Sequence, residues 1–90
     1  MRKILCNYGL HFSEIAQTFQ EKVELPGRQL KDLVDWLEKK HQGFEKELIH
    51  PVTGALMTRN AILVQRGEDN TGAISSLDAE LLDGDVLTFF

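Results

Sequence analysis

The chain has 90 residues, of which 14 are acidic and 10 basic, giving a formal net charge of −4. This length fits one folded domain, which we expect to span residues 1–90. The acidic balance argues against a nucleic-acid binder, and no apolar run is long enough to cross a bilayer. We therefore expect neither a nucleic acid nor a membrane as a partner. Mild acidity fits a partner with a basic surface, but it is also a common way to stay soluble.

A single cysteine, Cys6, limits the chemistry open to the chain. It excludes an intramolecular disulfide and any cysteine-based metal cluster within one chain. Because Cys6 lies in an apolar run, we expect a buried structural thiol. Arg2 and Lys3 are followed by an apolar run too short for a signal peptide, so we expect a cytoplasmic protein.

Alternating apolar and polar residues predict two N-terminal strands. In residues 2–8, Ile4, Cys6 and Tyr8 fall on one face. The other face carries Lys3, Leu5 and Asn7. Residues 18–25 alternate in the same way and suggest an antiparallel partner, with Phe19, Glu21, Val23 and Leu25 on one face. The link between the two strands, residues 10–17, is expected to be an irregular loop with some helical turn.

The best helix signal follows Pro26-Gly27 and runs from Arg28 to about His41. An apolar stripe at i, i+3, i+4 and i+7 predicts the buried side of this helix. The stripe consists of Leu30, Leu33, Val34 and Leu37. Trp36 is expected to cover the edge of the stripe, and Gly43 suits the stop after the helix.

The second half of the chain reads as short elements joined by turns. The expected elements are a helical turn at 44–49, a central or one-sided strand at 61–64, a mobile polar loop at 67–72, a packed connection at 77–82, a turn at 83–85 and a final strand at 86–90. The order strand, strand, helix, strand, loop, strand predicts an α+β fold. In it, a mixed sheet of four or five strands carries one main helix on one face.

No catalytic or cofactor-binding motif is present. His11, His41 and His50 are far apart in the sequence and have no partner at metal-ligand spacing, so we expect no metal site. Asp83 and Asp85 flank Gly84, and we interpret them as residues that set a tight turn. We therefore predict that the chain is not an enzyme and holds no cofactor.

Three segments resemble parts of one protein family, and they occur in the same order along the chain as in that family. The ending Leu81-Leu82-Asp83-Gly84-Asp85, followed by the apolar run 86–90, is similar to the last turn and strand of the ThiS and MoaD sulfur carriers. Leu25-Pro26-Gly27 with the helix stripe resembles the second strand and helix of MoaD and of the eukaryotic ubiquitin-related modifier. The run from Arg59-Asn60 to Gln65, followed by Gly67-Glu68-Asp69, is similar to the family's third strand and turn.

The resemblance covers nearly the whole chain and implies a ubiquitin-like β-grasp fold. It also implies a role in sulfur transfer or in molybdenum or tungsten cofactor biosynthesis. Carriers of this family end in Gly-Gly, which an activating enzyme adenylates before a thiocarboxylate forms. Their partners are that activating enzyme or the large subunit of a synthase.

The sequence departs from the family at its last residue. It ends in Phe89-Phe90, where the family continues to Gly-Gly, and no Gly-Gly pair occurs elsewhere. Two explanations stay open: a sequence shortened relative to the gene product, or a protein without the tail. We favour the second, in which the β-grasp body acts as a binding or regulatory module.

Alternation in the last strand predicts a contact surface. Leu87 and Phe89 point to one side of the strand, and Val86, Thr88 and Phe90 point to the other. The resemblance implies that Leu87 and Phe89 face the helix stripe, because the family's last strand usually places apolar residues there. The opposite side then carries Val86, Thr88 and Phe90 as candidate partner-binding residues. An exposed terminal aromatic side chain would mark a protein contact, and the alternative is that Phe90 folds back over the edge of the core.

The leading hypothesis for the function is a MoaD- or ThiS-like protein that acts through protein contact. The alternative is a non-catalytic accessory or regulatory subunit of a larger enzyme, without sulfur chemistry. An enzyme with a histidine or carboxylate site ranks behind both.

Overall fold

The computed structural model describes residues 1–56, 61–74 and 76–90. In chain order its elements are β1 (Arg2–Tyr8), α1 (Leu10–Ala16), β2 (Gln20–Leu25), α2 (Leu30–Lys40), α3 (Phe44–Leu48), β3 (Ile62–Arg66), β4 (Asp69–Ala73) and β5 (Val86–Phe89). The strands form one five-stranded sheet in the order β2-β1-β5-β3-β4. β1 and β5 are parallel and the other neighbours are antiparallel, so the expected mixed sheet is confirmed.

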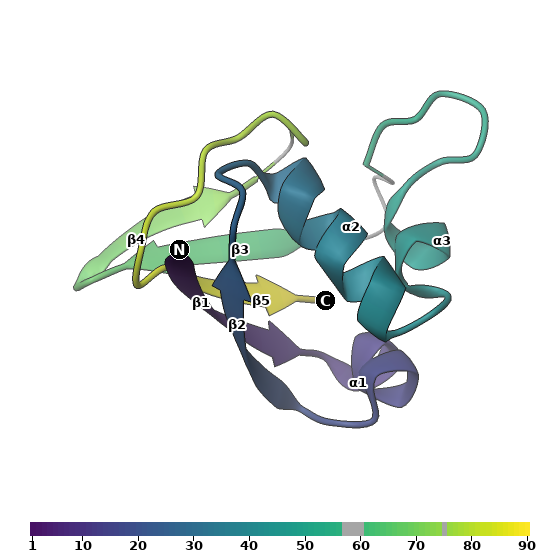
Figure 1. Cartoon of the computed structure of the whole chain (residues 1–90), viewed down its shortest axis with the longest axis horizontal. Helices are drawn as coiled ribbons and strands as arrows, with labels where there is room; N and C mark the ends of the chain where they lie inside the picture. The colour runs from purple at the N-terminus through teal and green to yellow at the C-terminus, as the bar shows by residue number, and fades with distance from the viewer. Residues whose placement is uncertain (57–60, 75) are drawn as a thin grey trace.

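Helix α2 crosses one face of this sheet (Figure 1) and is the main helix that the periodicity predicts. All four residues of its apolar stripe are at most 1% exposed. At its start, the Gln29 and Asp32 side chains form a reciprocal capping box with the backbone. Lys39 and Lys40 lie in its last turn, where positive charges interact favourably with the helix dipole. Trp36 is partly buried against the core, as expected.

Four aromatic side chains form the core at the end of the sheet where β1 and β5 finish. Neighbouring ring centroids lie 5.2–5.9 Å apart, within the range for favourable aromatic pairs. The cluster consists of Tyr8, Phe12, Phe44 and Phe89. Because each ring comes from a different element, the cluster joins β1, α1, α3 and β5 into one core.

Two segments are more regular than expected. The first is residues 10–16, where we expected an irregular loop with some helical turn and the structure has the regular helix α1. Phe12 and Ala16 are both buried one turn apart, which gives this short segment an apolar side. Phe19 lies before β2 and is 68% exposed, so it does not share the buried side of Val23 and Leu25.

The other segment is 67–72, for which the expectation of a mobile polar loop was wrong. Only Gly67 and Glu68 lie between the paired residues Arg66 and Asp69, so the segment is a tight hairpin that leads into the edge strand β4. Gly67 adopts a φ of +58°, which a two-residue hairpin turn requires. The preceding strand, β3, lies inside the sheet and is one-sided, because Ile62 and Val64 are buried and Leu63 is only half-buried.

Candidate protein-contact face

Strand β5 has one buried and one open side. Leu87 and Phe89 are 0% exposed, which confirms that they lie in the core. Val86 and Thr88 alternate with them and are half-buried, and Phe90 is 53% exposed. Phe90 therefore does not fold back over the core. The three candidate partner-binding residues thus lie outside the core.

Strand pairing places further apolar residues beside Val86 and Thr88. Leu5 is the register partner of Val86 in β1, and Leu63 is the register partner of Thr88 in β3. Paired residues in neighbouring strands point to the same side of a sheet. We call the patch that these residues form with Phe90 the open face. It consists of Leu5, Leu63, Val86, Thr88 and Phe90.

The backbone of the chain is held in place as far as Phe90. Gly9 N–H donates to Phe89 O at 2.7 Å, and Phe90 N–H donates to Ala61 O at 2.9 Å. A Cβ atom on Gly9 would lie only 3.0 Å from Phe89 O and 3.4 Å from Phe90 Cα. Glycine at position 9 therefore allows the close approach that presents the Phe90 side chain at a fixed point.

At the other end of β5, the carboxylate of Asp85 anchors the strand. Asp85 is 1% exposed and accepts hydrogen bonds from Arg66 Nε at 3.1 and 3.2 Å and from Leu82 N–H at 2.8 Å. Arg66 Nη2 also donates to Glu80 O at 2.7 Å. Since a buried carboxylate must be paired, this arrangement fixes the segment before β5 against β3.

The neighbouring Asp83 and Gly84 complete the turn that the sequence predicts. Asp83 Oδ1 accepts a hydrogen bond from Lys3 N–H at 2.6 Å, and Gly84 N–H donates to Lys3 O at 2.8 Å. Gly84 has a φ of +87°, where a side chain would cause strain. The two aspartates therefore join β5 to β1 and β3, as expected of residues that set a tight turn.

The helix-covered side holds a second carboxylate network, centred on Glu21. Tyr8 Oη donates to Glu21 at 2.8 Å, His41 Nε2 lies 2.9 Å from the same carboxylate, and Lys40 pairs with it as well. Burial raises the pKa of Glu21, but the hydrogen bonds from Lys40, His41 and Tyr8 outweigh it, and the net pKa is lowered. The network links β2 to the end of α2.

Cys6 lies next to this network as a buried thiol, as expected. Burial, together with the negative charge of Glu21, raises the pKa of Cys6 to about 12. Burial likewise raises the pKa of Tyr8. Both groups therefore stay protonated near neutral pH, and Cys6 is not a nucleophile there.

The three histidines lie in separate surroundings. His11 contacts Glu47 at 2.7 Å, His41 contacts Glu21, and His50 Nδ1 accepts a hydrogen bond from Val52 N–H at 3.1 Å. Within residues 1–56, 61–74 and 76–90, no group of three or more His, Cys, Asp or Glu side chains could hold a metal ion. In the same part of the chain, no helix is long and apolar enough to cross a membrane.

The sequence interpretation missed Leu5 and Leu63 as members of the open face. Local sequence patterns do not show that β1 pairs with β5, because the two strands lie at opposite ends of the sequence. One signal was present, since Leu5 is an apolar residue on the otherwise polar face of the first strand. Arg59 and Asn60, which contribute to the family resemblance, lie outside the described residues.

No protein-family model and no curated protein matches the sequence. Solved structures do match. A protein of Pyrococcus furiosus described as molybdopterin converting factor, subunit 1, is 29% identical, with a TM-score of 0.75 over 100% of this chain and 97% of that chain. Small archaeal modifier protein 1 of Haloferax volcanii is 21% identical, with a TM-score of 0.72 and the same coverage.

A chain of the Amycolatopsis orientalis BexX/CysO complex is 22% identical, with a TM-score of 0.66 over 97% of this chain and 92% of that chain. All three matches cover nearly the whole of this chain and of the neighbouring chain. The fold that the sequence resemblance implies is thus confirmed, and the chain has the ubiquitin-like β-grasp fold.

Proposed function

We propose that this chain is the β-grasp body of a MoaD- or ThiS-like protein that acts in sulfur transfer or molybdenum or tungsten cofactor biosynthesis. The observation that carries the proposal is the match to molybdopterin converting factor, subunit 1, over 100% of this chain at 29% identity. The protein works by contact with another protein in the cytoplasm and has no catalytic activity of its own. Its partner is an adenylating enzyme or the large subunit of a synthase.

The contact is made by the open face. Val86 and Thr88 lie on β5 and Phe90 follows it directly, and a bound protein would cover Leu5 and Leu63 as well. An apolar patch that the helices leave uncovered is what a protein interface needs at its centre. The fixed backbone at Gly9 and Phe90 reduces the ordering cost of binding.

The test uses two purified proteins from the genome that encodes this chain, the adenylating enzyme and the synthase large subunit. Isothermal titration calorimetry with each should give a one-to-one complex with at least one of them. The variant Val86→Asp should weaken that complex at least about tenfold, because it buries a charge in the interface. Absence of a complex with both proteins would contradict the proposal.

Intact-mass spectrometry of the gene product from its source separates the carrier from the accessory subunit. A C-terminal thiocarboxylate would support the sulfur carrier. A mature protein that ends at Phe90 with an ordinary carboxyl group, yet binds its partner, would instead support the accessory or regulatory subunit.

A further inference from the structure

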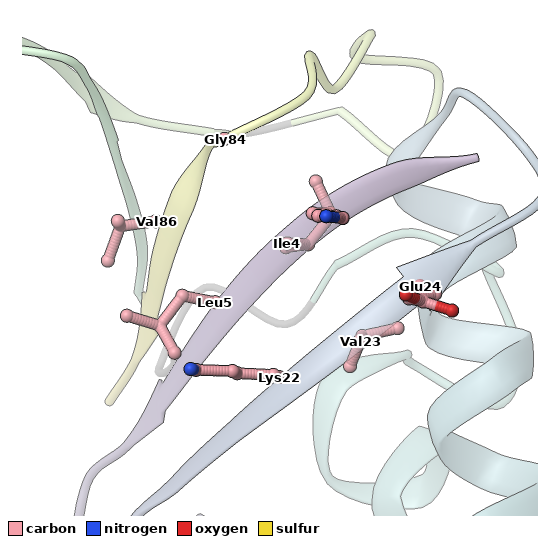
Figure 2. Close-up of a pocket in the computed structure, with 8 residues that line it drawn as sticks. Ile4, Leu5, Lys22, Val23, Glu24, Gly84 and Val86 are labelled. Carbon is pink, nitrogen blue, oxygen red and sulfur yellow. The ribbon is translucent and has the colours of Figure 1, made fainter.

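A groove with a volume of about 460 Å³ lies over β2, β1 and the start of β5, on the side away from the helices (Figure 2). Its apolar centre is formed by Leu5 and Val86, which are register partners. Lys22 is the register partner of Leu5 on the other side, and Lys3 also lines the groove. Figure 2 shows the side chains of Leu5, Lys22 and Val86 extending to the same side of the sheet.

Two lysines, Lys3 and Lys22, supply the positive charge of this groove. Both are exposed, and no described carboxylate lies within ion-pair distance of either one.

The lining therefore has a local charge opposite to that of the whole chain. Lys3 and Lys22 contribute two positive charges, and Glu24, the register partner of Lys3, contributes one negative charge. The lining is thus net positive in a chain whose net charge is −4. Two lysines are too few for a nucleic-acid surface. A wholly apolar occupant would remove water from the lysines without pairing them, which is unfavourable.

We propose that the groove binds a protein segment in which a large apolar side chain is flanked by carboxylates. The apolar side chain covers Leu5 and Val86, and the carboxylates pair with Lys3 and Lys22. This inference rests on the proposed function, because it names the chemistry of the partner that the open face contacts. It adds that partner selection depends on charge as well as apolar area.

The experiment titrates the ¹⁵N-labelled chain with two synthetic peptides and follows the amide NMR signals. The probes are acetyl-Glu-Leu-Phe-Glu-amide and acetyl-Lys-Leu-Phe-Lys-amide, which share the apolar pair and differ in the sign of their charge. We expect the acidic peptide to shift the amides of Leu5, Lys22 and Val86. It should bind about fivefold more tightly than the basic peptide at low salt, as a few exposed ion pairs allow.

The double variant Lys3→Glu/Lys22→Glu should reverse this order of affinity. The double variant Lys39→Glu/Lys46→Glu, at exposed positions of α2 and α3, makes the same change in net charge. It is the matched control and should leave the order unchanged. Equal affinity for the two peptides, or no shift with either, would overturn the inference. That outcome is distinct from failure of the proposed function, which is decided by complex formation with the adenylating enzyme and the synthase subunit.

Discussion

Alternate residues of β5 have opposite surroundings. Leu87 and Phe89 are completely buried, and Phe89 belongs to the aromatic cluster that joins four elements. Val86, Thr88 and Phe90 lie on the open face. Residues 86–90 thus supply part of the core and a candidate contact surface. Substitutions at neighbouring positions should therefore have different effects. Those on the buried side should lower stability, and those on the open face should weaken partner binding.

The largest expected contrast is between Phe89→Ala and Phe90→Ala. Loss of Phe89 leaves a cavity in the aromatic cluster and should lower the free energy of unfolding by about 3–5 kcal/mol. Loss of the half-exposed Phe90 should lower it by less than about 1 kcal/mol. Urea denaturation followed by circular dichroism measures both. Similar losses for the two variants would refute the division of β5 into a core side and a contact side.

The two aspartates of the turn give the next contrast. Asp85→Ala removes the buried partner of Arg66 and of Leu82 N–H, and should cost about 2–3 kcal/mol. Asp83→Ala removes one exposed hydrogen bond to Lys3 N–H and should cost about 1 kcal/mol. The same denaturation measurement applies. A larger loss for Asp83→Ala would contradict the anchoring role of Asp85.

Gly9→Ala tests how the end of β5 is held. The new Cβ atom would meet Phe89 O and Phe90 Cα, so the backbone of these residues must shift. We expect a loss of about 1 kcal/mol in stability, with weaker partner binding as well. The NMR signals of Phe89 and Phe90 should move, and those of α2 should stay in place. Unchanged signals at both phenylalanines would show that Gly9 does not position the contact residue.

The smallest effect is in the pH dependence of stability, where two glutamates of β2 differ. The lowered pKa of Glu21 means that its contribution is present above the unfolded-state pKa and is lost as the pH falls through the folded-state pKa. Glu21→Gln should therefore reduce the fall in the free energy of unfolding on acidification below about pH 4.5. Glu24→Gln, at an exposed position, is the control. Identical pH profiles for Glu21→Gln and the wild type would contradict the network.

Local patterns predicted the parts of the fold that depend on periodicity. The stripe of α2, the alternation in β1 and the turn at Gly84 all follow from neighbouring residues. Helix α1 and the hairpin between β3 and β4 did not follow. Seven residues are too few to reveal a helical period, and a polar edge strand resembles a loop in composition.

The candidate site was predicted only in part, for a related reason. Alternation within one strand grouped Val86, Thr88 and Phe90, and the family resemblance suggested that this group lies on the side away from the helix. Leu5, Leu63 and the lysines of the groove join them through contacts between strands distant in the sequence. Such pairings are set by the whole sheet. The turn at 83–85 follows from neighbouring residues, but the pairing of Asp85 with Arg66 joins two strands and could not be predicted locally.

The most direct test of the central claim is cross-saturation NMR on the methyl-labelled chain in complex with the adenylating enzyme or synthase large subunit that binds it. We expect saturation to reach the methyl groups of Leu5, Leu63 and Val86 on the open face. The core methyl groups of Leu33 and Leu37 under α2 should stay unaffected. Saturation that instead reached Val52, which is 85% exposed in the loop after α3, and spared Val86 would contradict the account.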